Sequence, residues 1–225
     1  MSQRTSIVSQ EFGENMNHEC NHPGELFIIS GPSGAGKGTI CKHLLEDASN
    51  MVLSVSATTR APREGEVHGE SYFFIDKETF IARIEEGGFL EYAEVYDNYY
   101  GTPKKNVMEK LAEGIDVVLE IDIQGAKKVK ETYPEGIFIF ILPPSLKELR
   151  KRLIGRGTDS MEVIEKRLAK SLDEIREIHA YDYFVVNDDL DIAVAEVEAI
   201  VTAEHDRVVD HGAELVKMFE EEEAE

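Results

Sequence analysis

The sequence reads Leu26-Phe27-Ile28-Ile29-Ser30 and then Gly31-Pro32-Ser33-Gly34-Ala35-Gly36-Lys37, and this junction decides the fold. The apolar run predicts a short buried strand, and the segment from Thr39 to Leu45 predicts a helix. A strand, a glycine-rich loop and a helix in that order form the context of a phosphate-binding loop, or P-loop. Glycines let backbone N–H groups come close to phosphate oxygens, and the positive end of the helix dipole attracts an anion.

The loop matches the consensus G-x-x-x-x-G-K-[ST] from Gly31 through Lys37, but Gly38 stands where a hydroxyl residue is expected. The hydroxyl comes one position later, at Thr39. We predict that Lys37 reaches the outer phosphates of a nucleotide, while the loop backbone cradles them. The alternative is a glycine-rich turn that binds nothing. Which group replaces the usual hydroxyl near Mg²⁺ is left open.

Composition and charge are those of an ordinary globular protein with an acidic surface. The 225 residues can form one sizeable core, and 42% of them are hydrophobic while 31% are charged. The net charge of −21 argues against a general nucleic-acid surface and against adhesion to an anionic membrane. Because nucleotides are anions too, we expect cationic side chains to be concentrated at the site.

Cysteine content and the N-terminal segment bear on where the chain works. Cys20 and Cys41 are too few for a disulfide scaffold, which indicates a reducing compartment, and we expect a cytoplasmic protein. We expect neither a membrane span nor a signal peptide, since no apolar stretch approaches about 20 residues and the N-terminus is polar. Residues 1–22 are expected to be a disordered extension.

Apolar runs and helical patterns alternate along the chain. The runs predict buried parallel strands at Leu26–Ser30, Val52–Val55, Val117–Ile121, Ile137–Leu142 and Tyr183–Val186. The helices are predicted at Gly38–Asp47, Lys104–Glu113, Gly125–Tyr133, Leu146–Leu153, Met161–Ala180 and from Ile192 to about Met218. Ser145 and Glu148 form a capping box before the fourth helix. The alternation predicts an α/β fold with a doubly wound, parallel five-stranded sheet and helices on both faces.

Two segments interrupt this alternation. Residues 56–102 are rich in Tyr, Phe, Glu and Gly, and we interpret them as an α+β insertion. Residues 23–55 and 103–225 then form the P-loop core. The run Gly155-Arg156-Gly157-Thr158 lies between two helices and is suited to bend, so we expect a short helical lid over residues 152–167.

Two arginines of the insertion are candidates for a second phosphate site. Arg60 and Arg63 flank Pro62, which restricts the backbone and presents both guanidinium groups in a defined direction. Guanidinium groups suit bidentate contacts to a phosphate. Tyr72 and the run Asn98-Tyr99-Tyr100-Gly101-Thr102 add hydroxyl groups. The alternative is a surface loop with ordinary arginines and core tyrosines.

Six separated motifs now occur in order: the P-loop, Ser-x-x-x-Arg-x-x-Arg, Asn-Tyr-Tyr-Gly-Thr, Asp-x-Gln-Gly, Gly-Arg-Gly and Val-Asn-Asp. On these motifs, over roughly residues 25–205, the chain resembles guanylate kinases, which phosphorylate GMP with ATP. The resemblance implies a kinase of purine nucleotide metabolism that uses ATP, Mg²⁺ and GMP or dGMP. We expect a monomer or a homodimer with no nucleic-acid or membrane partner.

The resemblance also implies roles for single residues. ATP would contact Gly31, Pro32, Ser33, Gly34, Ala35, Gly36, Lys37, Gly38, Thr39 and Asn187. GMP would contact Ser56, Arg60, Arg63, Glu66, Tyr72, Glu91, Tyr100, Thr102 and Asp122, with the arginines and tyrosines at the phosphate. Catalytic roles fall to Lys37, Arg60, Arg152, Arg156 and Arg167, the last three as lid arginines. We expect Mg²⁺ near Thr39 and Glu120, directly or through water.

The residue types agree with this chemistry. Guanine presents N1–H and its N2 amino group as adjacent donors, which a single carboxylate such as Glu91 can accept together. Adenine lacks that pair, and an unpaired polar group can discriminate by ~10⁴ or more. Thr102 or Ser56 can donate to the O6 side of the base. Transfer needs positioning and charge neutralisation but no side-chain base, because a GMP phosphate oxygen is already anionic.

Other functions share part of the pattern. Asp122-x-x-Gly125 also occurs in GTPases, but the Asn-Lys-x-Asp motif that reads guanine there is absent. An adenylate kinase-like enzyme is disfavoured by Glu91. A peptide-binding scaffold of the same family would have lost the P-loop lysine or lid arginines, and it remains the alternative function. For Arg152 and Arg167 the alternative role is a surface ion pair along a helix, and for Glu120 it is the cap of a strand.

Overall fold

The computed structural model of the chain describes residues 23–95, 97–155 and 160–207, together with residues 212–213, 216–217 and 219–220. Residues 1–22, for which we expect a disordered extension, lie outside this part. Within the described ranges, none of the helices combines the length and the apolar character that crossing a membrane requires.

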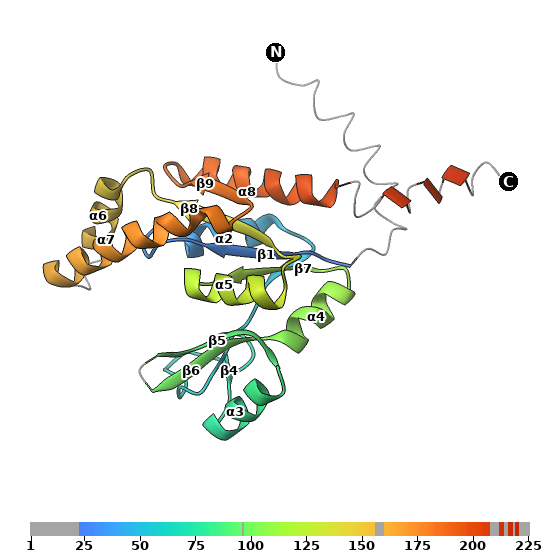
Figure 1. Cartoon of the computed structure of the whole chain (residues 1–225), viewed down its shortest axis with the longest axis horizontal. Coiled ribbons are helices and arrows are strands. Elements are labelled where there is room, and N and C mark those ends of the chain that lie inside the picture. The colour runs from blue at the N-terminus through green and yellow to red at the C-terminus, as the bar shows by residue number, and fades with distance from the viewer. Residues whose placement is uncertain are drawn as a thin grey trace, which may run out of the picture.

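A parallel sheet of five strands lies at the centre of the molecule, in the order β2-β7-β1-β8-β9 (Figure 1). The strands are β1 (Leu26–Ser30), β2 (Met51–Leu53), β7 (Asp116–Glu120), β8 (Ile137–Leu142) and β9 (Tyr183–Val186). In the central strand, Ile28 lies beside Leu119 of β7 and Phe138 of β8. The predicted five-stranded parallel sheet is confirmed, although β2 ends two residues before the expected Val55.

Helices cover both faces of this sheet. Side chains alternate along a strand, so Ile29 packs on one face with Leu44 of α2 (Lys37–Asp47) and Val197 of α8 (Leu190–His205). Ile28 packs on the opposite face, against α4 (Lys104–Ala112) and α5 (Ile123–Thr132). This double cover explains why every residue of β1 is buried. The strand that leads into the P-loop is therefore held rigidly.

The helices α6 (Leu146–Gly155) and α7 (Met161–Ile175) pack on each other through a small apolar cluster of their own. One half of the predicted capping box of α6 is confirmed, because the Ser145 hydroxyl accepts a 3.1 Å hydrogen bond from the Glu148 N–H. The single helix predicted from Met161 to Ala180 is wrong in its last turns. There the chain tightens into the 3₁₀ helix η1 (Arg176–Ala180).

The predicted C-terminal helix is also too long. α8 ends at His205, whereas the pattern predicted a helix to about Met218, which lies outside the described residues. Val201 packs against the core, and the last turn of α8 still contacts the sheet, since Glu204 is buried and the His205 ring packs edge-on against Phe27. Asp206 and Arg207 are not helical, and helical residues recur only in the short described stretches from 212 onward.

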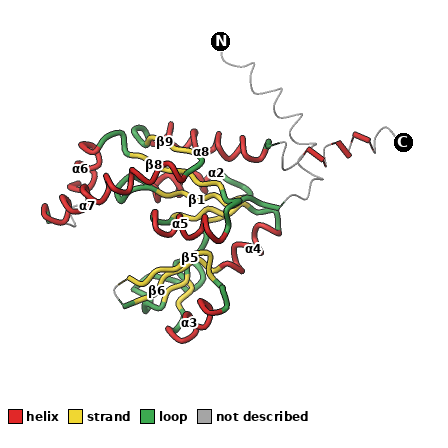
Figure 2. Tube along the Cα trace, viewed as in Figure 1, coloured by secondary structure: helices red, strands yellow, loops and turns green. Residues whose placement is uncertain are grey.

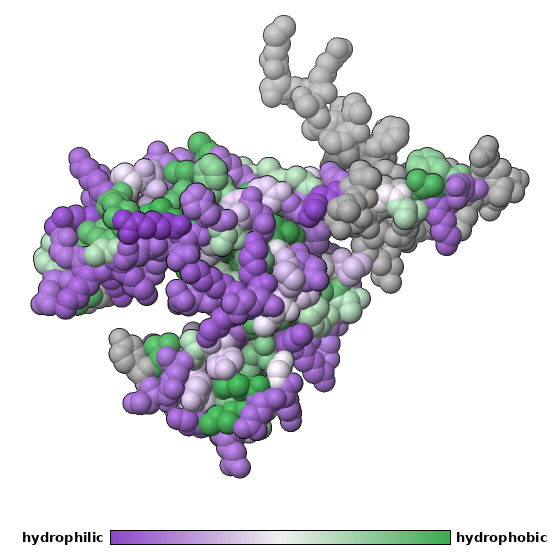
Figure 3. Space-filling model, viewed as in Figure 1, coloured by the Kyte–Doolittle hydropathy of each residue, from purple (hydrophilic) through white to green (hydrophobic). Residues whose placement is uncertain are grey.

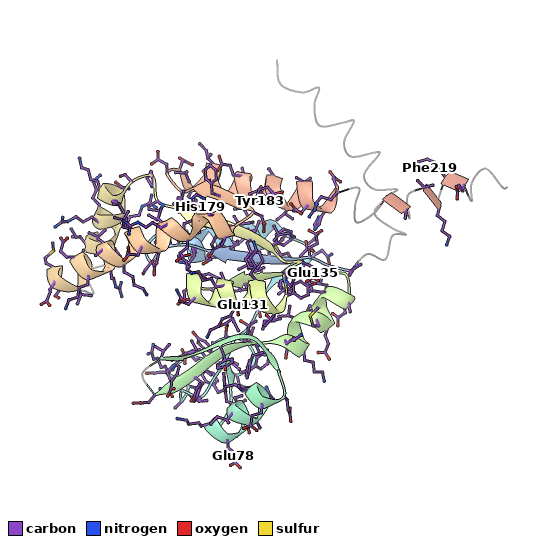
Figure 4. All side chains as sticks on the ribbon, in the orientation of Figure 1. Glu78, Glu131, Glu135, His179, Tyr183 and Phe219 are labelled. Atoms are coloured by element: carbon purple, nitrogen blue, oxygen red, sulfur yellow. The ribbon has the colours of Figure 1, made fainter. Side chains whose placement is uncertain are left out.

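A second, smaller sheet lies next to the core (Figure 2). Its strand order is β4-β3-β6-β5. Its elements are β3 (Ala57–Thr58), β4 (Phe73–Phe74), α3 (Lys77–Glu85), β5 (Phe89–Val95) and β6 (Asn98–Pro103). Phe80 of α3 stacks on Phe89 with ring centroids 4.3 Å apart, while Glu78 on the outer side of α3 points into solvent (Figure 4). The α+β character predicted for this insertion is confirmed.

Candidate active site

A cavity of about 580 Å³ opens at the carboxyl ends of β1 and β7, the edge where parallel α/β sheets bind ligands. It is lined by Gly31, Ser33, Gly34, Gly36, Lys37, Gly38, Thr39, Glu120, Ile121, Asp122, Lys170 and Glu174. The space-filling view shows a hollow between this part of the molecule and the insertion (Figure 3). Most of the predicted loop thus surrounds one cavity, but Pro32 and Ala35 do not line it.

The shape of the P-loop depends on glycine. Gly36 has a φ of +99°, and a Cβ at this position would lie 2.2 Å from Nδ2 of Asn187. Gly31 has a φ of +143°, and its Cβ would lie 2.3 Å from the carbonyl oxygen of Ile141. Gly36 also precedes α2 without any side-chain cap, so the first N–H groups of this helix have no side-chain partner there. The helix N-terminus is therefore open to an anion.

Two predicted site residues, Asn187 and Arg152, support this loop through hydrogen bonds to its backbone. The buried Asn187 donates from Nδ2 to the carbonyl oxygen of Ala35 at 2.8 Å. Arg152 donates from Nη2 to the carbonyl oxygen of Asn187 at 2.9 Å and from Nη1 to Ala35 O at 3.5 Å. Glu148 lies 3.8 Å from the same guanidinium group, one helical turn away. Arg152 thus contacts the P-loop backbone as well as making the helix-surface ion pair that is its alternative role.

Lys37 lies over the loop and faces three carboxylates. Its Nζ donates to the carbonyl oxygens of Gly31 at 2.7 Å and Pro32 at 3.2 Å. Burial lowers the pKa of Lys37, while the negative charges of Glu120, Glu174 and Asp122 act in the opposite direction. An incoming phosphate would supply stronger compensation for this ammonium group than neutral carbonyl groups do.

The end of β7 contributes two carboxylates. Both oxygens of Glu120 lie 3.2 Å from the position that a Cβ on Gly38 would take, so the absence of a side chain there makes room for this carboxylate. The Thr39 hydroxyl and the Glu120 carboxylate provide the oxygen ligands that Mg²⁺ prefers, and both residues line the cavity. Asp122 caps α5 by accepting a 2.8 Å hydrogen bond from the Gly125 N–H.

In the insertion, Arg60 is held on one side by Glu66. Its Nη2 lies 2.8 Å and 3.0 Å from the two carboxylate oxygens, which raises the pKa of Arg60 and lowers that of Glu66. The guanidinium carbon of Arg60 lies 5.5 Å from the centroid of the Tyr72 ring, and Tyr72 packs edge-on against Tyr100. Four residues that are predicted to contact GMP therefore form one cluster: Arg60, Glu66, Tyr72 and Tyr100.

Arg63 joins this cluster through its backbone. Its N–H donates to Glu66 Oε2 at 2.7 Å, and its side chain is exposed. The same carboxylate thus fixes the Arg60 guanidinium group and the backbone of Arg63.

The other end of the insertion carries Glu91, whose side chain is partly buried. Glu91 of β5 lies opposite Thr102 of β6, and the buried Thr102 hydroxyl donates to Glu91 Oε1 at 2.8 Å. Burial raises the pKa of Glu91, as does the charge of Asp122, whereas the Thr102 hydrogen bond lowers it. Ser56 precedes β3 and is half-buried, and its carbonyl accepts a hydrogen bond from the Phe73 N–H.

The lid is described only in part. Arg156 lies outside the described residues. Arg167 lies on α7, one turn before Lys170 and two turns before Glu174. Sequence reasoning missed these last two residues, which line the P-loop cavity and form an ion pair with Lys170 Nζ 3.3 Å from Glu174 Oε1. The signal was available, because residues three, four and seven apart share a helix face. Arg167 and these two residues follow that spacing.

Comparison with known proteins identifies the family. The family model described as Guanylate kinase matches residues 24–204. The guanylate kinase of Clostridioides difficile (strain 630) is 54% identical over 199 residues, covering 88% of this chain and 97% of that protein. The one from Caldanaerobacter subterraneus subsp. tengcongensis is 57% identical over 199 residues, covering 88% and 96%.

The fold agrees with that relationship. The crystal structure of guanylate kinase from Anaplasma phagocytophilum is 36% identical to this chain, with a TM-score of 0.65, and the match covers 84% of this chain and 89% of that one. The overall fold of this chain thus recurs in a solved relative. The chain belongs to the guanylate kinase family.

Proposed function

We propose that this kinase transfers the γ-phosphoryl group of ATP to GMP, giving ADP and GDP, and that it also accepts dGMP. The observation that carries the proposal is the pairing of two sites. One is the P-loop cavity. The other lies in the insertion, where Glu91 of β5 accepts a hydrogen bond from Thr102 and the loop after β3 carries the Arg60–Glu66 pair. A peptide-binding scaffold has no need of Lys37 in a buried phosphate loop.

The acceptor base is recognised by Glu91. Its carboxylate can accept hydrogen bonds from N1–H and the N2 amino group of guanine, while Thr102 and Ser56 are available to the O6 side. Because Glu91 is partly buried, a base without this donor pair would leave its carboxylate short of hydrogen-bond partners. Such a penalty supports selection of guanine over adenine.

The acceptor phosphate is held by the arginine cluster. Arg60, fixed by Glu66, and Arg63, with its exposed guanidinium group, would contact the phosphate of GMP together with Tyr72 and Tyr100. We assign residues 56–102 to this acceptor site. Asp122, close to both Lys37 and Glu91, would lie between the two nucleotides.

The donor is held by the loop backbone. Lys37 and the open N–H groups of α2 would bind the β- and γ-phosphates, and Asn187 would support the loop beside the adenine. Mg²⁺ would be held through Thr39 and Glu120, and when bound it neutralises charge on the two outer phosphates. An anionic phosphate oxygen of GMP attacks the γ-phosphorus, and the bond to the β-phosphate oxygen breaks.

Closure of the lid completes the site. We assign it to residues 152–167, with Arg152, Arg156 and Arg167 as the arginines that offset charge on the transferring group. Water excluded by this closure can no longer hydrolyse ATP. We further propose that the enzyme works in the cytoplasm as a monomer or a homodimer.

The test is a coupled assay of ADP formation with GMP, dGMP, AMP, CMP and UMP as acceptors. We expect GMP to give the highest kcat/KM, dGMP to follow, and the other three to be poor. A preference for AMP would overturn the guanine assignment. No turnover with any acceptor, together with tight peptide binding, would favour the scaffold.

A further inference from the structure

The helix α5 covers the open edge of the second sheet. β5 is the last strand of that sheet, and it is bonded to β6 on one side only. An edge strand presents unpaired carbonyl groups on its free side. In this molecule α5 lies along that side, so it occupies the boundary between the core and the insertion (Figures 1 and 2).

Two side chains of α5 hold the free edge of β5 on either side of Glu91. The Thr132 hydroxyl donates to the carbonyl oxygen of Leu90 at 2.8 Å. Lys128 Nζ donates to the carbonyl oxygen of Tyr92 and lies 5.1 Å from the centroid of the Tyr92 ring. The residue between these two contacts is the carboxylate assigned to the guanine base. Its backbone position is therefore set from α5.

The charge of Lys128 also acts on Glu91. Among the described residues, burial and the negative charge of Asp122 raise the pKa of Glu91, while Lys128 and the Thr102 hydrogen bond lower it. Asp122 and Lys128 both belong to the α5 segment, at its cap and in its second turn. Glu91 must be ionised to accept two hydrogen bonds from one guanine, since a protonated carboxyl group offers a donor in place of an acceptor.

We propose that Lys128 is a positioning residue for the acceptor base, which holds the Glu91 strand against α5 and places a positive charge beside its carboxylate. This inference rests on the proposed function, in which Glu91 reads guanine. Lys128 itself does not touch the substrate in this scheme. The neighbouring Lys127 offers a matched control, because it points to a different partner and forms a 2.9 Å ion pair with Glu177 of η1.

Kinetics of Lys128→Met, Lys128→Arg and Lys127→Met separate these roles. Methionine keeps the apolar stem of lysine but removes the charge and the donor. We expect Lys128→Met to raise KM for GMP about three- to tenfold, with kcat and KM for ATP little changed. Lys128→Arg should recover most of the loss, and Lys127→Met should resemble the unmodified enzyme.

The pH dependence of kcat/KM for GMP gives a second test, because a purely structural role of Lys128 would leave it unchanged. Without Lys128 the pKa of Glu91 rises further, so the acid limb of kcat/KM for GMP should shift to higher pH in Lys128→Met. Lys127→Met should leave the limb in place. The titration of the GMP phosphate itself is common to all variants and cancels in the comparison.

The outcomes distinguish this inference from the proposed function. If the unmodified enzyme does not phosphorylate GMP, the proposed function fails. If it does, but Lys128→Met has normal KM for GMP and an unmoved acid limb, only the role of Lys128 is overturned. Equal changes in Lys128→Met and Lys127→Met would also overturn it, as would a loss confined to thermal stability.

Discussion

The two proposed anion sites of this molecule are built in different ways. The donor site is made of backbone: a glycine loop at a helix N-terminus, braced through Ala35 by the buried amide of Asn187 and by Arg152. The acceptor site is made of side chains that are already paired with one another, Arg60 with Glu66 and Glu91 with Thr102.

This contrast follows from what each site must distinguish. Phosphate groups are alike in every nucleotide, so the donor phosphates can be bound largely by backbone N–H groups, with Lys37 adding a positive charge. A base is distinguished by its pattern of donors and acceptors, which only oriented side chains can match. We therefore expect changes in the loop to affect ATP use, and changes in the insertion to affect GMP use. The predictions below test that separation, from the largest effect to the smallest.

Lys37→Ala should have the largest effect. Removing the ammonium group that faces the transferring phosphate should lower kcat about 10³-fold, because charge stabilisation in a sheltered site is lost. Stability should change little, since burial already lowers the pKa of Lys37 and so opposes its charge. Steady-state kinetics and a thermal melt check both points. Lys42→Ala, on the exposed side of the same helix, is the control.

Arg60→Ala should come next and should act on the other substrate. Loss of charge-assisted hydrogen bonds to the GMP phosphate should lower kcat/KM for GMP about 10²-fold. Arg60→Lys should recover only part of the lost kcat/KM for GMP. A guanidinium group can donate to Glu66 and to a phosphate at the same time, and an ammonium group lacks this planar set of donors. The exposed Arg83 of α3 is the matched control. A comparable rise in KM for ATP in Arg60→Ala would contradict separate sites.

Asn187→Ala should have a smaller effect, on the donor side alone. The carbonyl group of Ala35 loses a 2.8 Å hydrogen bond, and the loop loses a support that it needs to keep its shape. We expect KM for ATP to rise about five- to tenfold and KM for GMP to stay constant. Asn50→Ala removes a similar amide-to-carbonyl bond, to Gly114, at an exposed position and serves as the control. An unchanged KM for ATP would limit Asn187 to a structural role.

The donor site could be predicted from the sequence because it is local. Strand, loop and helix follow one another within about 20 residues, and each glycine marks a special backbone position. The five parallel strands followed from the alternation of apolar runs and helical patterns, and the α+β insertion from the interruption of that alternation. The order of the strands was not predicted. The C-terminal helix was predicted too long because its helical pattern continues past His205, whereas α8 ends there and Asp206 and Arg207 are not helical.

The contacts that complete each site could not be predicted in the same way, because they join distant parts of the chain. Asn187 reaches Ala35 across 152 positions, and Lys128 reaches Tyr92 across 36. Arg152, which we propose as a lid arginine, also reaches the Ala35 carbonyl of the P-loop across 117 positions. Lys170 and Glu174 were missed because a charged pair on a helix has the same pattern as an ordinary exposed surface.

Titration calorimetry on the unmodified enzyme, Lys37→Ala and Arg60→Ala tests the separation of the two sites most directly. Two separate titrations into the folded protein would be made, one with a non-hydrolysable ATP analogue in the presence of Mg²⁺ and one with GMP. We predict that Lys37→Ala weakens the ATP analogue but binds GMP normally, and that Arg60→Ala does the reverse. Equal weakening of both ligands in either variant, or no binding of either ligand to the unmodified enzyme, would contradict the account.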